Sequence, residues 1–185
     1  CNAGDYIEIF VNNPNATATS VTYSEFSIFR LSGPTTISLT ETVACRYTNA
    51  SGQSIPNNAN TAVTGWTKDY DTQGFFNSST GVATIPTAGK YQIDFGLIYQ
   101  SASVVVATQY ELIISQSGST TRDIVLSDFF PTGSTTIYVY VGGTTCIQCN
   151  AGDTLTVKTY QSSGGARTLL ADATVNQVAI YRVGN

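Results

Sequence analysis

The side chains that could do chemistry are few in this chain, and histidine is missing altogether. None of the 185 residues is a histidine, which removes the usual general base, the Ser-His-Asp and Cys-His arrangements, and every metal site that uses imidazole. The sequence also lacks a G-x-S-x-G nucleophile motif, a phosphate-cradling loop and a zincin motif. We therefore predict no catalytic residue and no enzyme activity.

Two carboxylates with regular spacing lie in the segment KDYDT. Asp69 and Asp71 are two residues apart, so on a strand they would share one face. Paired carboxylates can hydrolyse a glycosidic bond or supply oxygen ligands to calcium. Calcium takes about six oxygens, and only these two have a suitable spacing. The metal hypothesis is therefore limited to Asp69 and Asp71, and no other cofactor is expected.

The thiols are Cys1, Cys45, Cys146 and Cys149. The segment CIQC has the spacing of a redox or zinc motif. A zinc site made only of thiolates needs four of them, so it would have to recruit Cys1 and Cys45 from distant segments. The simpler interpretations are a local disulfide between Cys146 and Cys149, or two free thiols beside a turn. The redox compartment decides between these two.

Charge is scarce in the chain, which limits the classes of partner. Charged residues make up 11% of the sequence, against roughly 25% in an average soluble protein. The net charge of −4, with eight Lys and Arg residues, argues against nucleic acid as a partner, because phosphate binding needs a basic footprint. No apolar run approaches the roughly 20 residues of a membrane span.

Hydrophobic residues alternate with polar ones nearly everywhere, which is the period of a β-strand. The longest such segment, residues 89–100, puts five large side chains on one face: Tyr91, Ile93, Phe95, Leu97 and Tyr99. Similar runs rich in Val, Ile, Thr, Tyr and Phe are separated by clusters of Gly, Pro, Asn and Ser. We predict an all-β fold of many short strands.

The pentapeptide CNAGD occurs twice, at Cys1 and at Cys149. An alternating strand, a variable loop and a second strand follow each copy, and after the first copy comes the breaker SGP. A lipidated Cys1 is the alternative explanation of the first copy, but the second copy is internal. We predict that residues 1–33 are the last two strands of a preceding repeat and that residues 34–185 are a complete domain.

Residues 61–100 resemble the complement-component-1q/tumour-necrosis-factor superfamily. The resemblance continues in a strand that starts at Gly152-Asp153 and in a closing strand that ends at Tyr181, where Val175 and Gln177 replace the usual Phe and Gly. The positions that match the family's central motif are Phe76, Asn77, Thr80, Gly81, Ala83, Pro86, Gly89 and Tyr91. Within this superfamily, the residue sequence most resembles the microbial and viral (phage fibre-like) branch.

Two of these motif positions also have a plain physical role. Residues 77–81 are expected to form a turn in which Gly81 takes a positive φ. Asp153 begins a strand after a turn, where an aspartate usually caps backbone amides.

The resemblance implies a ten-strand jelly roll of two sheets that assembles as a homotrimer, and several relatives bind calcium. Large aromatic residues are expected either in the core or at the trimer contact, and the sequence does not divide them between the two. This set is Trp66, Tyr91, Phe95, Tyr99, Tyr138, Tyr140 and Tyr181.

Two functions fit these features. The first is a trimeric binding and display module of a viral or extracellular fibre, which contacts a surface glycan or protein through loops. The candidate loop residues are Gln161 and Arg167, with Asn12 and Asn15 in the first copy. The alternative is a purely structural subunit of a virion or filament that self-associates by strand sharing. Both place the protein outside cells or on a virion surface.

Overall fold

The computed structural model describes residues 43–104, 108–132 and 135–185. The predictions for residues 1–33, including those for Cys1, Asn12 and Asn15, lie outside the described residues. The described part contains strands and no helix, and therefore no helix that could cross a membrane. The strands are β1 (Ala44–Asn49), β2 (Ser54–Ile55), β3 (Thr61–Ala62), β4 (Trp66–Asp71), β5 (Phe76–Asn77), β6 (Val82–Thr84), β7 (Gly89–Val104), β8 (Tyr110–Ser117), β9 (Arg122–Phe129), β10 (Thr135–Cys149), β11 (Thr154–Gln161), β12 (Arg167–Thr168) and β13 (Gln177–Gly184).

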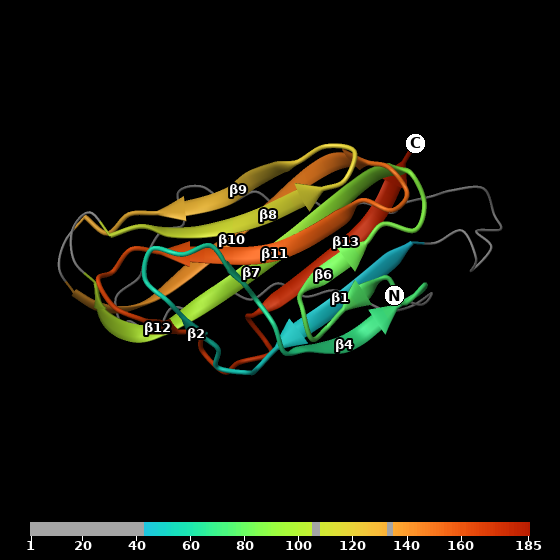
Figure 1. The fold of residues 1–185 in the computed structure, drawn as a ribbon. Helices are drawn as coiled ribbons and strands as arrows, with labels where there is room; N and C mark the ends of the chain where they lie inside the picture. Colours follow the sequence, from blue (N-terminus) through green and yellow to red (C-terminus); the bar gives the residue numbers. More distant parts are fainter. Residues whose placement is uncertain (1–42, 105–107, 133–134) are drawn as a thin grey trace, which may run out of the picture. The chain divides into compact units, whose positions relative to one another are not determined.

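Ten of these strands form two sheets that pack face to face (Figure 1). The first sheet has the order β10-β7-β13-β1-β4, and the second has the order β5-β6-β11-β8-β9. Strand β3 adds to β11, and β12 pairs with β2 outside the two sheets. The described pairs are antiparallel. The predicted all-β, two-sheet jelly roll is confirmed, with ten strands in the two orders given above and β3 as an additional strand of the second sheet.

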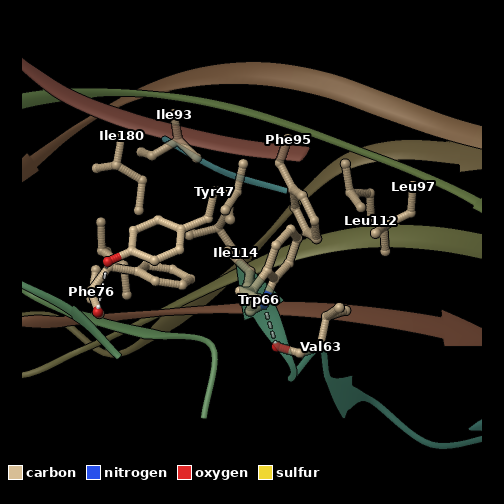
Figure 2. Packing of buried hydrophobic residues seen from close by; sticks show 14 of the residues in the cluster. Tyr47, Val63, Trp66, Phe76, Ile93, Phe95, Leu97, Leu112, Ile114 and Ile180 are labelled. Atoms are coloured by element: carbon tan, nitrogen blue, oxygen red, sulfur yellow. Dashed lines mark hydrogen bonds between the residues drawn. The ribbon is translucent and has the colours of Figure 1, made fainter. Parts of the chain in front are cut away.

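The core lies between the two sheets and follows the predicted alternation. All five side chains predicted to share one face of β7 are buried. Figure 2 shows aromatic rings from several strands meeting there. Trp66 packs edge-on against Phe76 with ring centroids 6.1 Å apart, and its indole N–H donates to the Val63 carbonyl at 2.7 Å. Burying a large apolar side chain contributes roughly 1.5–3 kcal/mol, so this cluster holds the sheets together.

The predicted turn before β6 is present. Gly81 has φ 70°, and its amide donates to the Asn77 carbonyl at 2.9 Å. A β-carbon on Gly81 would lie directly against the Val63 carbonyl oxygen, so a side chain would clash there. Glycine is needed at this position for both backbone angle and space.

Several loops gather at one end of the sandwich, away from Asn185 (Figure 1). Residues 108–109 lead into β8 and meet residues 162–166 after β11, because the Ser162 amide donates to the Gln109 carbonyl at 3.0 Å. Residues 56–60 join them through the Asn58 amide, which donates to the Gln161 carbonyl at 2.8 Å. We call residues 56–60, 108–109 and 162–166 the loop end.

Candidate functional site: one sheet face and the loop end

Asp69 and Asp71 do not act together, because a bulge separates them. Strand β4 shifts register opposite Arg46 and Tyr47, so Asp69 is an extra residue in the strand. Asp69 forms an ion pair with Arg46 at 3.1 Å. A strand pair without the bulge would have put both carboxylates on one face.

Asp71 instead holds the loop that follows β4. Its carboxylate accepts hydrogen bonds from the Tyr47 hydroxyl at 3.0 Å and from the Phe76 amide at 3.0 Å. The Phe75 amide donates to the second oxygen at 3.2 Å. Among the described residues, no group of three or more acidic or thiol side chains could hold a metal ion. The calcium site remains a prediction.

Of the two interpretations of Cys146 and Cys149, the structure has the free thiols and not the local disulfide. In the described part of the chain Cys45, Cys146 and Cys149 are free thiols. Cys146 and Cys149 are three residues apart on β10, so they point to opposite faces: Cys146 is exposed and Cys149 is buried. Burial raises the pKa of Cys149 to about 11, which keeps it a protonated thiol and a poor nucleophile at neutral pH.

Gln161 was predicted to contact a ligand, but it lies inside the loop end and is fully buried. Its amide nitrogen donates to the carbonyls of Ile55 at 3.1 Å and Gly165 at 2.8 Å. Its amide oxygen accepts from the Ser163 amide at 2.8 Å and from the Ser163 hydroxyl at 2.6 Å. Gln161 therefore fixes the shape of the loop and does not itself face a partner.

Arg167 is better placed for contact than Gln161. It lies on β12 at the edge of the loop end and is half-buried. Its Nε donates to the Ser163 hydroxyl at 2.7 Å. On the neighbouring loop, the Asn57 side chain accepts from the Gly164 amide at 2.8 Å. These bonds make the loop end an ordered, amide-rich surface.

The aromatic residues divide between the core and one outward face. Trp66, Tyr91, Phe95 and Tyr99 are core residues. The others lie on the side of the first sheet that faces away from the core. Tyr138 and Tyr140 are each 57% exposed and alternate with the buried Val139 and Val141. Tyr181 alternates with the buried Ile180 and is half-buried.

Tyr70 belongs to the same outward face. It pairs in register with Arg46 of β1, which alternates with the buried Cys45 and Tyr47, and it is 47% exposed. Tyr70, Tyr138, Tyr140 and Tyr181 together define what we call the tyrosine face.

Charged groups at the centre of the tyrosine face are bonded to other groups of the same chain. Asp94 on β7 accepts from the Tyr181 hydroxyl at 3.0 Å and from the Thr144 hydroxyl at 2.5 Å. Burial and the neighbouring Asp94 carboxylate raise the pKa of Tyr181 to about 12, so its hydroxyl stays protonated and keeps donating. Arg46, besides its ion pair with Asp69, donates to the Gln177 side chain at 2.8 Å.

Sequence reasoning missed Tyr70, Arg46 and Asp94 as members of this face. The signal that could have found Asp94 is its position between Ile93 and Phe95, which puts it on the polar side of the longest strand. Tyr70 and Arg46 depend on the bulge and on the pairing of β1 with β4, which local spacing does not reveal.

Comparison with known proteins supports the fold. No protein-family model and no curated protein matches the sequence. Among solved structures, murine APRIL at pH 5.0 superposes with a TM-score of 0.56 and 14% identity, over 76% of this chain and 98% of that one. The Eiger TNF of S. frugiperda gives 0.54 and 12%, over 76% and 92%. The globular domain of zebrafish complement 1qA gives 0.52 and 15%, over 75% and 93%.

The two sheets, their strand order and these neighbours define the fold. The chain has a jelly-roll fold of the tumour-necrosis-factor and complement-1q type.

Proposed function

We propose that the chain is a non-enzymatic binding and display module of an extracellular or viral fibre, and that it works as a homotrimer. The observation that carries this proposal is the tyrosine face. It exposes three large aromatic rings on one sheet, and tyrosine is enriched where proteins meet. The charged groups at the centre of this face already have hydrogen-bond or ion-pair partners in the chain, so covering the face does not strip them of their polar partners.

A cyclic trimer needs two different surface patches, because each subunit contacts its neighbours head to tail. The tyrosine face supplies one. The second candidate is the outer strand β9 and the residue after it, where Val125 and Phe130 are 50% and 53% exposed. Other large exposed hydrophobic groups are scarce in the described part of the chain, so these two patches are the natural counterparts.

In this proposal the loop end contacts the outside partner, a surface glycan or a protein. Its support is the ordered loop around Gln161, the position of Arg167 at its edge, and the location of this end away from Asn185 (Figure 1). The likeness to a TNF and to a complement globular domain also favours recognition over catalysis. Rigid scaffolds commonly place recognition in such loops.

The test is the mass of the protein in solution, measured by sedimentation velocity and light scattering over a wide concentration range. We expect residues 1–185 and residues 34–185 both to form trimers, and Tyr138→Ser to weaken association at least tenfold. Tyr160→Ser is the matched control, because Tyr160 lies on the second sheet.

A wild-type protein that stays monomeric at every concentration would overturn the proposal. If residues 34–185 are monomeric while residues 1–185 assemble, the first 33 residues make the contact. That result would favour the alternative, a structural subunit that associates by strand sharing.

A further inference from the structure

Two glycines face each other in the middle of the paired strands β7 and β10 of the first sheet. Gly142 of β10 pairs in register with Gly96 of β7. Neither has a φ in the left-handed region, so the backbone does not require glycine at either position. Glycine in a strand interior weakens the strand. Two such residues side by side therefore need another explanation. That explanation is a side chain that lies over both glycines on the outward face of the sheet.

The side chain of Tyr140 occupies that space. A β-carbon built on Gly96 would lie 2.7 Å from the Tyr140 hydroxyl oxygen and 3.3 Å from Cζ. A β-carbon on Gly142 would lie 2.6 Å from Cζ and 2.8 Å from Cε1. These separations are too short for real contacts. The tyrosine therefore lies flat across both glycines, on the outward face of the sheet.

We propose that Gly96 and Gly142 are a floor that fixes the ring of Tyr140, and that this ring is the anchor by which a second copy of the chain binds. The inference rests on the proposed self-assembly through the tyrosine face. One side of the ring is supported by the glycine floor, and 57% of the residue remains exposed. An aromatic group that is already held in place loses little conformational freedom on binding.

A second copy is the occupant that the surrounding charges favour. Close by, Asp94 is bonded to Tyr181 and Thr144, and Arg46 is paired with Asp69. A charged peptide would therefore have to compete with these bonds for Asp94 and Arg46. A copy of this chain brings aliphatic and aromatic groups of its own, and these match a flat ring.

The test uses Gly142→Ala, with Gly184→Ala as the matched control. Gly184 lies on β13 of the same sheet, with open space above it and no left-handed φ. We expect Gly142→Ala to lift the ring and to raise the dissociation constant of the assembly at least tenfold, while Gly184→Ala leaves it unchanged. Tyr140→Ser, which leaves the glycine floor intact, should weaken association by a similar factor.

The double variant Gly142→Ala, Tyr140→Ser separates this inference from a general loss of stability. If both changes act through one ring, the double variant associates no more weakly than Tyr140→Ser alone. Thermal unfolding of the diluted proteins shows whether the protomer remains folded. Additive losses would overturn the inference, and so would unchanged association in Tyr140→Ser.

The outcomes also distinguish the inference from the proposal beneath it. A wild-type protein that never assembles overturns the proposed function. A wild-type trimer that tolerates Gly142→Ala and Tyr140→Ser without loss overturns only the role of the ring. Loss of binding to immobilised glycans in these variants, with association unchanged, would assign the ring to a sugar and would also overturn the inference.

Discussion

Asp153 is the residue that ties two neighbouring turns together. Its carboxylate accepts from the Ser119 amide at 2.7 Å and the Ser119 hydroxyl at 2.6 Å, on the loop between β8 and β9. It also accepts from the Asn150 amide at 2.9 Å, in the turn before β11. The predicted capping role is confirmed, and the contact to Ser119 extends it to a second loop. These bonds, those from Ser119 first, lower the pKa of Asp153 to about 2.

The pH dependence of stability follows from this shift. Because the folded-state pKa of Asp153 lies below its ordinary value of 3.8, its contribution is fully present above about pH 4 and is lost as the pH falls toward 2. We expect Asp153→Asn to lower the free energy of unfolding by roughly 2 kcal/mol at pH 7. Urea unfolding between pH 7 and pH 2 should show the difference from wild type shrinking on acidification.

The control for this experiment is Asp69→Asn. It removes a surface ion pair with Arg46, which is worth about 1 kcal/mol or less. A difference between wild type and Asp153→Asn that stays constant down to pH 2 would contradict the assigned role of the carboxylate.

At the scale of the elements, β9 and β10 are neighbouring edge strands of different sheets. Among the described strands, β9 pairs only with β8, and β10 pairs only with β7. They approach closely at Gly143, where a β-carbon would lie 2.6 Å from the Leu126 carbonyl oxygen and 3.0 Å from its Cβ. This contact brings the two exposed edges together, and covering an edge is one way in which β proteins avoid unwanted pairing.

Gly143→Ala should therefore separate the two edges. We expect the free energy of unfolding to fall by about 1–3 kcal/mol, as for other insertions into a packed site, and we would measure it by thermal and urea unfolding. Gly165→Ala is the comparison, because Gly165 has open space around it. Equal stability of the two variants would show that Leu126 can move away without cost.

The sequence predicted strands well and predicted their contacts poorly. Strand β7 could be predicted because its five core side chains alternate without interruption, and the turn at Gly81 could be predicted because only glycine fits there. The bulge in β4 depends on which strand pairs with it, so Asp69 and Asp71 were wrongly placed on one face. Gln161 was misassigned because burial of its amide depends on polar groups that converge from two segments, Ile55 and residues 163–165.

At the scale of the whole molecule, the strand order places β13 between β1 and β7. Its amides and carbonyls therefore bond on both sides, to residues such as Ala44 and Ile93. Within the described ranges, the outer strands β4 and β9 have one bonded side each. Stability within a domain varies with such bonding, and protection from hydrogen exchange reports it.

We expect the amides of β13 and β7 to exchange with the free energy of global unfolding and those of β4 and β9 to exchange sooner. Hydrogen exchange followed by mass spectrometry or NMR would measure this order. Protection of β9 equal to that of β13 in a dilute monomer would contradict it. If β9 is covered in the trimer, the protection of its amides from hydrogen exchange should increase with protein concentration.

The pairing of β1 with β13 has a consequence for how the protein is made. Ala44 meets Tyr181, so β1 leaves the ribosome long before its partner strand exists. Until then the backbone groups of β1 that face β13 have no partner strand, and the first sheet cannot close. We therefore expect this domain to fold only after β13 has been translated. A chain that stalls earlier would expose an incomplete first sheet with unpaired strand edges, to which chaperones could bind.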